Sequence, residues 1–248
     1  MSQVKWNVEH LVHVDSTNTW LAQRAREGAR AHLAVYCDFQ SAGRGRLERE
    51  WHAPAGSSLL CSALVEAPAA PVAPQWVVVA AALAVADALE ESTGRRPDLK
   101  WPNDVLYGES KVAGLLAEVV ACGASSMIVV GLGLNLVAVD PAFQSATTVL
   151  AATATSLEPR DALTPYLAAL DRRRSQLDSS AGVRELSRDY EGDLVTLGQR
   201  VRVELAQGSL VGTAVGVDDA GALVVDTESG ARVFNAGDVV HVRGEGSR

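Results

Sequence analysis

The sequence of 248 residues has only three cysteines, Cys37, Cys61 and Cys122, which are far apart and lie among apolar or small residues. This spacing fits neither a disulfide framework nor a zinc cluster. We therefore expect reduced thiols packed in a core. Internal repeats and low-complexity segments are also missing. Hydrophobic residues at 48% and charged residues at 21% are typical of a folded globular protein.

Long apolar runs are missing as well. The longest, from Trp76 to Ala86, is much shorter than the roughly 20 residues that a membrane-spanning helix needs. The first ten residues contain no apolar segment of the kind found in secretory signals. A net charge of −8 disfavours nucleic-acid binding, which usually needs a basic surface. We therefore expect a cytoplasmic protein with no membrane and no nucleic-acid partner.

The apolar pattern predicts a mixed sheet flanked by helices, that is, an α+β fold. Polar residues from Asp15 to Asn18 offer N-caps for the first helix, and Gly28 is predicted to end it. At the end of the last long helix, Arg172, Arg173 and Arg174 are predicted to face solvent. We expect helices over 19–27, 74–92 and 160–177, and strands over 10–14, 32–39, 57–65, 99–101, 112–121 and 127–136.

The composition changes near Thr196. From Val201 onward apolar and polar residues alternate, and glycines at 208, 221 and 230 interrupt the pattern. Short alternating segments separated by turns are typical of a small β-barrel of about 50 residues. We therefore predict two domains, a larger one over residues 1–195 and a smaller one over residues 196–248.

Glycine and arginine alternate in a predicted loop, as Gly43-Arg44-Gly45-Arg46, and Arg49 follows. Glycine lets the backbone approach a ligand closely, and arginine supplies a planar fork of donors that stays charged at any working pH. Such a loop suits an anionic ligand with phosphate or carboxylate oxygens. A loop of this composition can also be a solvated connector.

Two further motifs follow along the chain. The row Lys100-Trp101-Pro102-Asn103-Asp104 precedes Lys111 and Gly114. A lysine at the entrance of a buried strand can stabilise the extra negative charge of a transition state, although a surface lysine beside a turn is the alternative. The row Gly131-Leu132-Gly133-Leu134-Asn135 ends a strand. Its glycines could let a flat ligand lie on the backbone, and Asn135 could bind an amide-like edge such as adenine; a strand ending in glycine without any ligand is the alternative.

In this order the three motifs resemble those of the biotin protein ligases, and Ser16-Thr17-Asn18 matches the S-T-N that opens the same pattern. The resemblance runs from about Val14 to Arg243. It implies a catalytic core similar to that of class II aminoacyl-tRNA synthetases, followed by an SH3-like barrel. It also implies an ATP-dependent ligase that converts biotin to biotinyl-5′-AMP, releases pyrophosphate and passes biotin to a lysine of a biotin carboxyl carrier domain, such as that of acetyl-CoA carboxylase.

The resemblance implies roles for single residues. Asp104 is expected to orient the incoming lysine amine; helping to deprotonate it or bracing the turn are alternatives. Mg²⁺ is expected to screen the triphosphate without a dedicated metal cage. The implied catalytic residues are Lys111, Arg46 and Asp104. The implied biotin-binding residues are Ser16, Thr17, Asn18, Gln40, Gly43, Arg44, Lys111, Gly114, Gly131 and Gly133. The implied ATP-binding residues are Arg46, Arg49, Trp51, Asn103, Lys111 and Asn135.

The chain departs from the family pattern in the arginine loop, which commonly reads G-R-G-R-x-G-R. Here Leu47 and Glu48 precede Arg49, so Glu48 replaces a glycine. Some family members carry an N-terminal helix-turn-helix domain. The residues before Asp15 are too few to form such a domain. We therefore expect a ligase without a DNA-binding role, as a monomer or homodimer, with residues 40–56 closing over the site. A lipoate–protein ligase, or a non-catalytic module that binds biotin or nucleotide, are the alternative functions.

Overall fold

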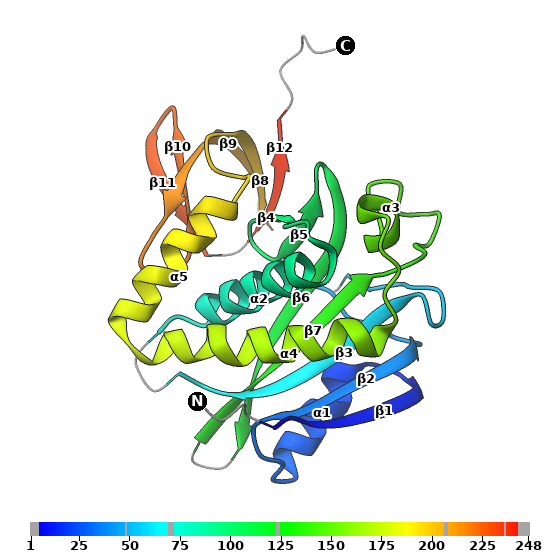
Figure 1. The fold of residues 1–248 in the computed structure, drawn as a ribbon. Coiled ribbons are helices and arrows are strands. Elements are labelled where there is room, and N and C mark those ends of the chain that lie inside the picture. Colours follow the sequence, from blue (N-terminus) through cyan, green and yellow to red (C-terminus); the bar gives the residue numbers. More distant parts are fainter. Residues whose placement is uncertain are drawn as a thin grey trace.

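The computed structural model describes residues 5–47, 49–68, 72–122, 125–205, 208–235 and 237–242, which form two β-sheets with helices packed around the larger one (Figure 1). Glu48 and Arg243 lie outside these ranges. The larger sheet has the strand order β1-β2-β3-β7-β6-β5-β4. β1 runs parallel to β2, and the other neighbours are antiparallel, so the predicted mixed sheet is confirmed. The strands are β1 (Asn7–Val14), β2 (Leu33–Gln40), β3 (Ser58–Glu66), β4 (Asp98–Lys100), β5 (Asp104–Tyr107), β6 (Ser110–Cys122) and β7 (Ser125–Asn135).

The central strands are apolar along nearly their whole length because helices cover both faces of the sheet. Eight of the nine residues of β3 are buried. Helices α2 (Gln75–Thr93) and α4 (Pro159–Ser175) cover one face, and α1 (Thr17–Arg26) covers the other (Figure 1). Small side chains in α2 let it pack closely against its neighbours. α2 ends at Gly94, which adopts the left-handed conformation with φ of 71° that favours glycine.

Helix α1 starts two residues before the predicted position, and this difference matters for the site. Its N-cap is Ser16, in an extended conformation, and the Ser16 side chain makes no capping hydrogen bond. Thr17 and Asn18 fall in the first turn and are buried. Polar side chains that would ordinarily cap the helix are therefore available for contacts across the sheet.

The C-terminal strands form a separate antiparallel sheet with the order β11-β10-β9-β8-β12. Val201 and Val203 alternate with exposed residues along β8, as the sequence pattern predicted. Within the described residues no ladder joins β11 to β12, so this small β-domain is an open sheet instead of a closed barrel. The predicted fold class, α+β with a small C-terminal β-domain, is confirmed. The strands are β8 (Arg200–Leu205), β9 (Gly208–Val217), β10 (Leu223–Thr227), β11 (Gly230–Phe234) and β12 (Asp238–His241).

Two buried indoles attach the C-terminal sheet to the larger one. Trp76 Nε1 donates to the Asp219 carbonyl oxygen at 2.8 Å, and Trp101 Nε1 donates to the Gly221 carbonyl oxygen at 3.3 Å. Each tryptophan is 1% exposed. The Trp101 backbone amide also donates to Thr196 Oγ1 at 3.1 Å. The turn between β9 and β10 therefore lies directly on the start of α2 and on the segment that follows β4.

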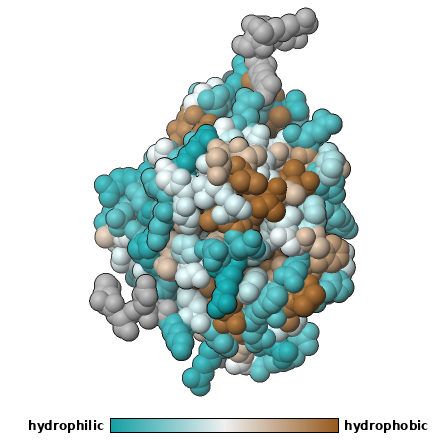
Figure 2. Space-filling model, turned by 45° about the vertical axis from the view of Figure 1, so that its right-hand side comes forward, coloured by the Kyte–Doolittle hydropathy of each residue, from teal (hydrophilic) through white to brown (hydrophobic). Residues whose placement is uncertain are grey.

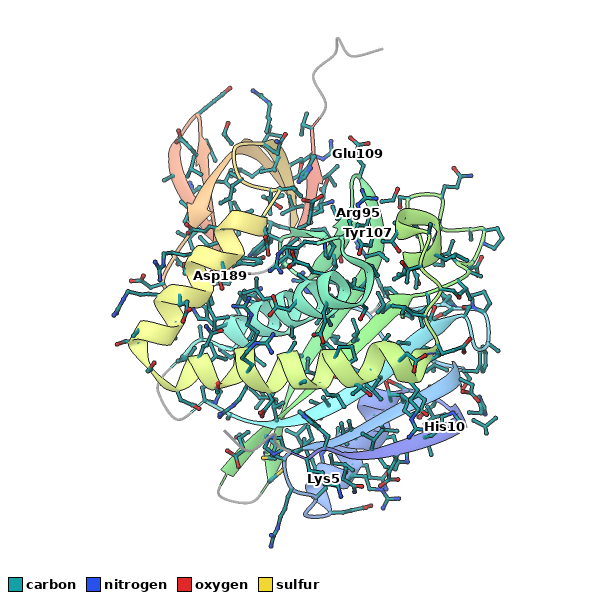
Figure 3. The ribbon with its side chains drawn as sticks, in the orientation of Figure 1. Lys5, His10, Arg95, Tyr107, Glu109 and Asp189 are labelled. Atoms are coloured by element: carbon teal, nitrogen blue, oxygen red, sulfur yellow. The ribbon has the colours of Figure 1, made fainter. Side chains whose placement is uncertain are left out.

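Several short elements were not predicted from the sequence. β5 has four residues and pairs with β6 through the turn around Gly108. In Figure 3 Tyr107 and Arg95 lie beside each other at this hairpin, where Tyr107 Oη donates to the Arg95 carbonyl oxygen at 3.0 Å. The helix predicted over 160–177 ends at Ser175 and continues as a single 3-10 turn. The other elements that were not predicted are α3 (Val149–Thr153), the 3-10 turn η1 (Gln176–Asp178) and α5 (Ser180–Asp193).

The arginines at the end of α4 correct the prediction that all three face solvent. Arg173 is only 13% exposed and its Nε lies 2.8 Å from Asp87 Oδ2 of α2. It also pairs with Asp189 of α5, labelled in Figure 3. Arg174, 16% exposed, pairs with Asp178 at 2.7 Å. The prediction is wrong for Arg173 because α2 and α5 present carboxylates to it, and wrong for Arg174 because Asp178 in the 3-10 turn after α4 pairs with it. Arg172, 60% exposed, fits the prediction.

One face of the molecule carries apolar residues in separate patches (Figure 2). On the face drawn in Figure 2, hydrophobic areas are divided by hydrophilic ones. Among the residues that the structure describes, no helix is long and apolar enough to cross a membrane. Cys37 and Cys61 are buried, as predicted. Burial raises the pKa of the Cys37 thiol to about 12, with a further contribution from Asp38.

Candidate active site

A cleft of about 440 Å³ lies where the edge of the larger sheet meets the C-terminal sheet. The structure brings together residues from the start of α1, the arginine loop, the β4–β6 region and the end of β7. Of the site residues predicted from the sequence, all but Gly43 line this cleft. The arginines near position 45 and Lys111 therefore face one cavity, although the chain separates them widely.

Backbone hydrogen bonds fold the arginine loop back on itself. The Gly45 amide donates to the Arg49 carbonyl oxygen at 2.7 Å, and the Trp51 amide donates to the Gly43 carbonyl oxygen at 2.9 Å. A Cβ atom at Gly43 would lie 2.4 Å from the Trp51 carbonyl oxygen, so only glycine fits. Gly43 thus lets the two sides of the loop approach each other. It shapes the loop and does not line the cleft.

Each arginine of the loop has a different partner. Arg44 Nη1 lies 2.9 Å from Glu118 Oε1, and Arg46 Nη1 donates to Asn103 Oδ1 at 3.3 Å. Arg49 pairs with Asp238 of β12. Burial lowers the pKa of Arg46 because it penalises the charged form, while nearby Asp238 and Asp104 act in the opposite direction. An anion bound in the cleft would act in the same direction as these carboxylates.

Lys111 is held at the start of β6. Its Nζ lies 2.6 Å from Asp104 Oδ1 and 5.4 Å from the centre of the Trp51 ring. Its backbone amide donates to the Ser145 carbonyl oxygen at 2.9 Å, and its carbonyl accepts from the Thr147 amide at 2.8 Å. The side chain is 34% exposed. The ammonium group is therefore fixed at the wall of the cleft with a carboxylate as its nearest partner.

The glycines of β6 and β7 make room for side chains of the site. We expected Gly131 and Gly133 to let a flat ligand lie on the backbone. In the structure, a Cβ at Gly133 would lie 2.3 Å from Trp51 Cε2, and one at Gly131 would lie 2.2 Å from Asn18 Oδ1. At Gly114 an added Cβ would approach both Lys111 and Trp51 to 3.0 Å. The lack of a side chain at these glycines therefore leaves the space that Trp51, Asn18 and Lys111 occupy.

The Trp51 indole leaves one polar group without a partner. Within the described residues, Trp51 Nε1 is buried and makes no hydrogen bond. A buried donor of this kind loses free energy unless a ligand or water satisfies it. The indole therefore offers both a flat apolar face and an N–H donor to whatever occupies the cleft.

The opposite wall of the cleft is polar and neutral. The backbone amide and the Oγ1 hydroxyl of Thr17 both donate to Gln40 Oε1, at 2.8 and 3.0 Å. Ser16 is 2% exposed and lies beside them. With its oxygen occupied, Gln40 can offer its Nε2 group as a donor. Such a wall suits an uncharged ligand that carries carbonyl and N–H groups.

The two predicted asparagines of the ATP-binding set are anchored to the backbone. Asn103 Nδ2 donates to the Leu115 carbonyl oxygen at 2.7 Å, and Asn135 Nδ2 donates to the Thr147 carbonyl oxygen at 3.2 Å. Asn135 is 5% exposed. Both amides therefore have a fixed orientation before any ligand binds.

Sequence reasoning missed three residues of this region. Ser62 of β3 contacts both Thr17 and Asn18, and Glu118 of β6 contacts Arg44 and Asn18. Both are polar residues inside apolar runs, which was the signal that could have identified them. Asp238 of β12 pairs with Arg49 and lines the cleft, and nothing in its local sequence indicates this role.

With this geometry, comparison with known proteins defines the class of the chain. Residues 11–135 match the model of the biotin/lipoate A/B protein ligase family, and the chain belongs to this family. Residues 196–242 match the model of the biotin protein ligase C-terminal domain. The second match starts where the composition of the sequence changes.

Individual relatives narrow the class further. The biotin–[acetyl-CoA-carboxylase] ligase of Mycobacterium tuberculosis is 38% identical over 92% of this chain and 86% of that protein. The enzyme of the same name from Paracoccus denitrificans is 33% identical over 92% of this chain and 98% of that protein. The biotin protein ligase of Aquifex aeolicus in complex with biotin and ATP has a TM-score of 0.82, with 28% identity over 96% of this chain and 99% of that one.

Proposed function

We propose that the chain is an ATP-dependent biotin–protein ligase. It activates biotin to biotinyl-5′-AMP, releases pyrophosphate, and transfers biotin to a lysine of a biotin carboxyl carrier domain such as that of acetyl-CoA carboxylase. The observation that carries this proposal is the cleft of about 440 Å³, where Arg44, Arg46 and Lys111 meet a neutral polar wall around Gln40. The names of the relatives from M. tuberculosis and P. denitrificans support the same reaction.

The two walls of the cleft match the two ends of biotin. The ureido ring is neutral and offers one carbonyl and two N–H groups, which suits Ser16, Thr17 and Gln40. The valeryl carboxylate is anionic and suits Arg44 and Lys111. Asn18 and the glycines at 43, 114, 131 and 133 complete the biotin-binding set by shaping this part of the cleft.

In the first half-reaction a carboxylate oxygen of biotin attacks the α-phosphorus of ATP. The bond between that phosphorus and the bridging oxygen breaks, and the electron pair leaves with pyrophosphate. Negative charge grows on the non-bridging α-phosphate oxygens as the bond forms, and Lys111 and Arg46 stabilise it. We assign Arg49 to the phosphate tail, and assign Trp51, Asn103 and Asn135 to the nucleotide, because they line the same cleft.

In the second half-reaction the acceptor lysine attacks the acyl carbon of biotinyl-5′-AMP as a neutral amine. The mixed anhydride bond breaks, AMP leaves with the electron pair, and the amine loses one proton. Asp104 is 25% exposed and lies 2.6 Å from Lys111 Nζ, so its carboxylate stands at the reacting end of the cleft. We assign it to orienting the incoming amine.

Magnesium fits this arrangement as a companion of ATP. Within the ranges that the structure describes, no group of three or more His, Cys, Asp or Glu residues could hold a metal by itself. Mg²⁺ commonly uses one or two carboxylates together with substrate phosphates, and Asp104 and Asp140 border the cleft. When bound, Mg²⁺ would screen the triphosphate charge.

We also propose that the boundary between catalytic and C-terminal domains lies at residues 195 and 196. The C-terminal domain then contributes to the active site, because Asp238, Val239 and Val240 of β12 line the cleft. Its pairing of Asp238 with Arg49 supports a role at the phosphate end of the site.

The test is a transfer assay with the full chain, biotin, MgATP and a biotin carrier domain, read by mass spectrometry of the carrier. We expect the carrier to gain one biotinyl group, and lipoate to give no product. Lys111→Ala should lower adenylate formation by roughly 10² to 10³-fold, as expected when one transition-state donor is removed. The matched control is Lys5→Ala, since Lys5, labelled in Figure 3, is exposed and does not line the cleft. A carrier that gains no mass, or gains lipoyl in place of biotinyl groups, would reject the proposal.

A further inference from the structure

Glu118 of β6 lies between two residues of the proposed biotin-binding set. Its Oε2 accepts a hydrogen bond from Asn18 Nδ2 at 2.8 Å, and its Oε1 lies 2.9 Å from Arg44 Nη1. The Glu118 side chain is 28% exposed, so its contacts are partly shielded from water. One carboxylate thus joins the first turn of α1 to the arginine loop.

The polar groups of the Asn18 side chain are all hydrogen-bonded within the protein. Its Oδ1 accepts from Ser62 Oγ at 2.6 Å, and its Nδ2 donates to Glu118 and to the Leu116 carbonyl oxygen at 3.3 Å. The residue is 4% exposed, and Gly131 leaves just enough space for it. An amide group has two N–H donors, and both are occupied here. Asn18 therefore serves to hold other groups in position.

The hydrogen bonds continue from Asn18 to the wall that faces the ligand. Ser62 Oγ lies 2.8 Å from Thr17 Oγ1, so its single proton is shared between Thr17 Oγ1 and Asn18 Oδ1. Thr17 Oγ1 in turn donates to Gln40 Oε1 at 3.0 Å. We call Glu118, Asn18, Ser62, Thr17 and Gln40 the polar relay. Because Thr17 occupies the oxygen of Gln40, the relay presents Gln40 as a donor with a fixed orientation.

We propose that Glu118 is a positioning residue for biotin recognition, which fixes the amide of Asn18 and the guanidinium of Arg44 together. The inference rests on the proposed function, since it assigns a task within the biotin end of that site. Glu118 Oε2 accepts from Asn18 and also from Arg44 Nη1, at 3.0 Å, while Oε1 lies near the same Arg44 nitrogen, so one carboxylate holds the amide and the guanidinium against each other. Both ends of biotin thus depend on one side chain that touches no reacting atom.

This role predicts a split between binding and chemistry. Glu118→Gln keeps the size of the side chain but removes its charge, and turns one of its two acceptors into a donor that faces Asn18 or Arg44. We expect the biotin Kd, measured by calorimetry with the full chain, to rise about tenfold, which corresponds to about 1.4 kcal/mol. The KM for ATP and the kcat of adenylate formation should stay within about twofold of the parent values.

A matched control separates the contacts of Glu118 from loss of charge alone. Glu91→Gln removes the same charge from an exposed position on α2 and should leave the biotin Kd unchanged. Ser62→Ala interrupts the polar relay from β3 without altering charge, and should also raise the biotin Kd. An unchanged Kd in Glu118→Gln overturns the inference whatever Ser62→Ala does. A fall in kcat or a rise in the KM for ATP as large as the rise in the biotin Kd overturns it as well.

A double-mutant cycle tests the coupling itself. If Glu118 acts through Arg44 and Asn18, the tenfold effect of Glu118→Gln should shrink to about threefold or less in an Arg44→Ala or Asn18→Ala background. A tenfold effect that persists in both backgrounds overturns the inference. If the parent chain itself neither binds biotin nor forms biotinyl-5′-AMP, the proposed function fails; if it does both and the variants match it, only the role of Glu118 fails.

Discussion

Replacing Gly133 with alanine tests whether the Trp51 indole must lie against β7. The added Cβ would stand 2.3 Å from Trp51 Cε2, whereas ordinary contacts begin at 3.4 Å, so the ring must withdraw by about 1.1 Å (3.4 less 2.3 Å). The same ring lies 5.4 Å from Lys111 Nζ. A displacement of about 1 Å near a reacting centre can lower the rate on the order of 10²-fold, or roughly 2.7 kcal/mol. We therefore expect kcat/KM for ATP in adenylate formation to fall about 100-fold.

The assay is pyrophosphate release with biotin and MgATP at several ATP concentrations. Gly216→Ala is the matched control, because Gly216 also lies in a strand and an added Cβ there would meet nothing within 4 Å. It should leave kcat/KM unchanged. A thermal unfolding midpoint measured for both variants separates a local shift of the indole from a general loss of stability.

Two results would refute the reasoning. Full activity in Gly133→Ala would mean that the position of the indole does not matter. An equally large effect of Gly133→Ala in a Trp51→Ala background would mean that the methyl group acts on something other than the indole, since the clash no longer exists there.

The remaining predictions concern charge and burial. Asp238→Asn removes the partner of Arg49, whose side chain is 66% exposed, so the free energy of unfolding should change by less than about 1 kcal/mol. Trypsin should cleave the arginine loop faster in this variant, and an unchanged cleavage rate would contradict the prediction. Burial raises the pKa of Asp87, but hydrogen bonds led by Arg173 outweigh it and hold the pKa below the ordinary 3.8, so the carboxylate stabilises the fold above pH 3.8 and loses this contribution as pH falls through its lowered pKa. Asp87→Asn should therefore lower the free energy of unfolding by about 2 kcal/mol at pH 7, and urea titrations should show the difference shrinking below pH 3.8. Because burial raises the pKa of Cys37 to about 12, iodoacetamide at pH 8 should alkylate it only after unfolding, as peptide mass mapping would reveal.

The fold could be predicted where the sequence has strong periodic patterns. β3, β7 and α2 are long and apolar, and their predicted bounds lie within one or two residues of those in the structure. The four residues of β5 have no such pattern, and they form a strand because β4 and β6 pair with them on either side. The predicted solvation of Arg173 was wrong for a related reason: its partner Asp87 lies 86 residues away, on another helix. Contacts between distant segments leave no local signal.

The site residues also divide into those that the sequence indicates and those that depend on contacts between distant segments. Arginine, lysine and glycine stood out because unusual residue types cluster in short motifs, and these motifs line one cleft. The structure adds a second reason for the glycines, because an added Cβ at Gly133 or Gly131 would meet Trp51 or Asn18, while both glycines line the cleft. Glu118 and Ser62 could have been noticed as polar residues in apolar strands. Their partners, however, are fixed by the pairing of β6 and β3 with β7.

The seam between the two sheets carries a consequence for variation in this chain. Trp76 and Trp101 donate to the turn at Asp219 and Gly221, and the same small sheet places β12 at the mouth of the cleft. A substitution in that turn changes no residue that lines the cleft, yet it alters the contacts that hold the sheet carrying β12 against the larger one. Natural or engineered exchanges of the C-terminal segment must therefore preserve the shape of this joint, and surveys of harmful variants should treat it with the same weight as the residues that bind substrate.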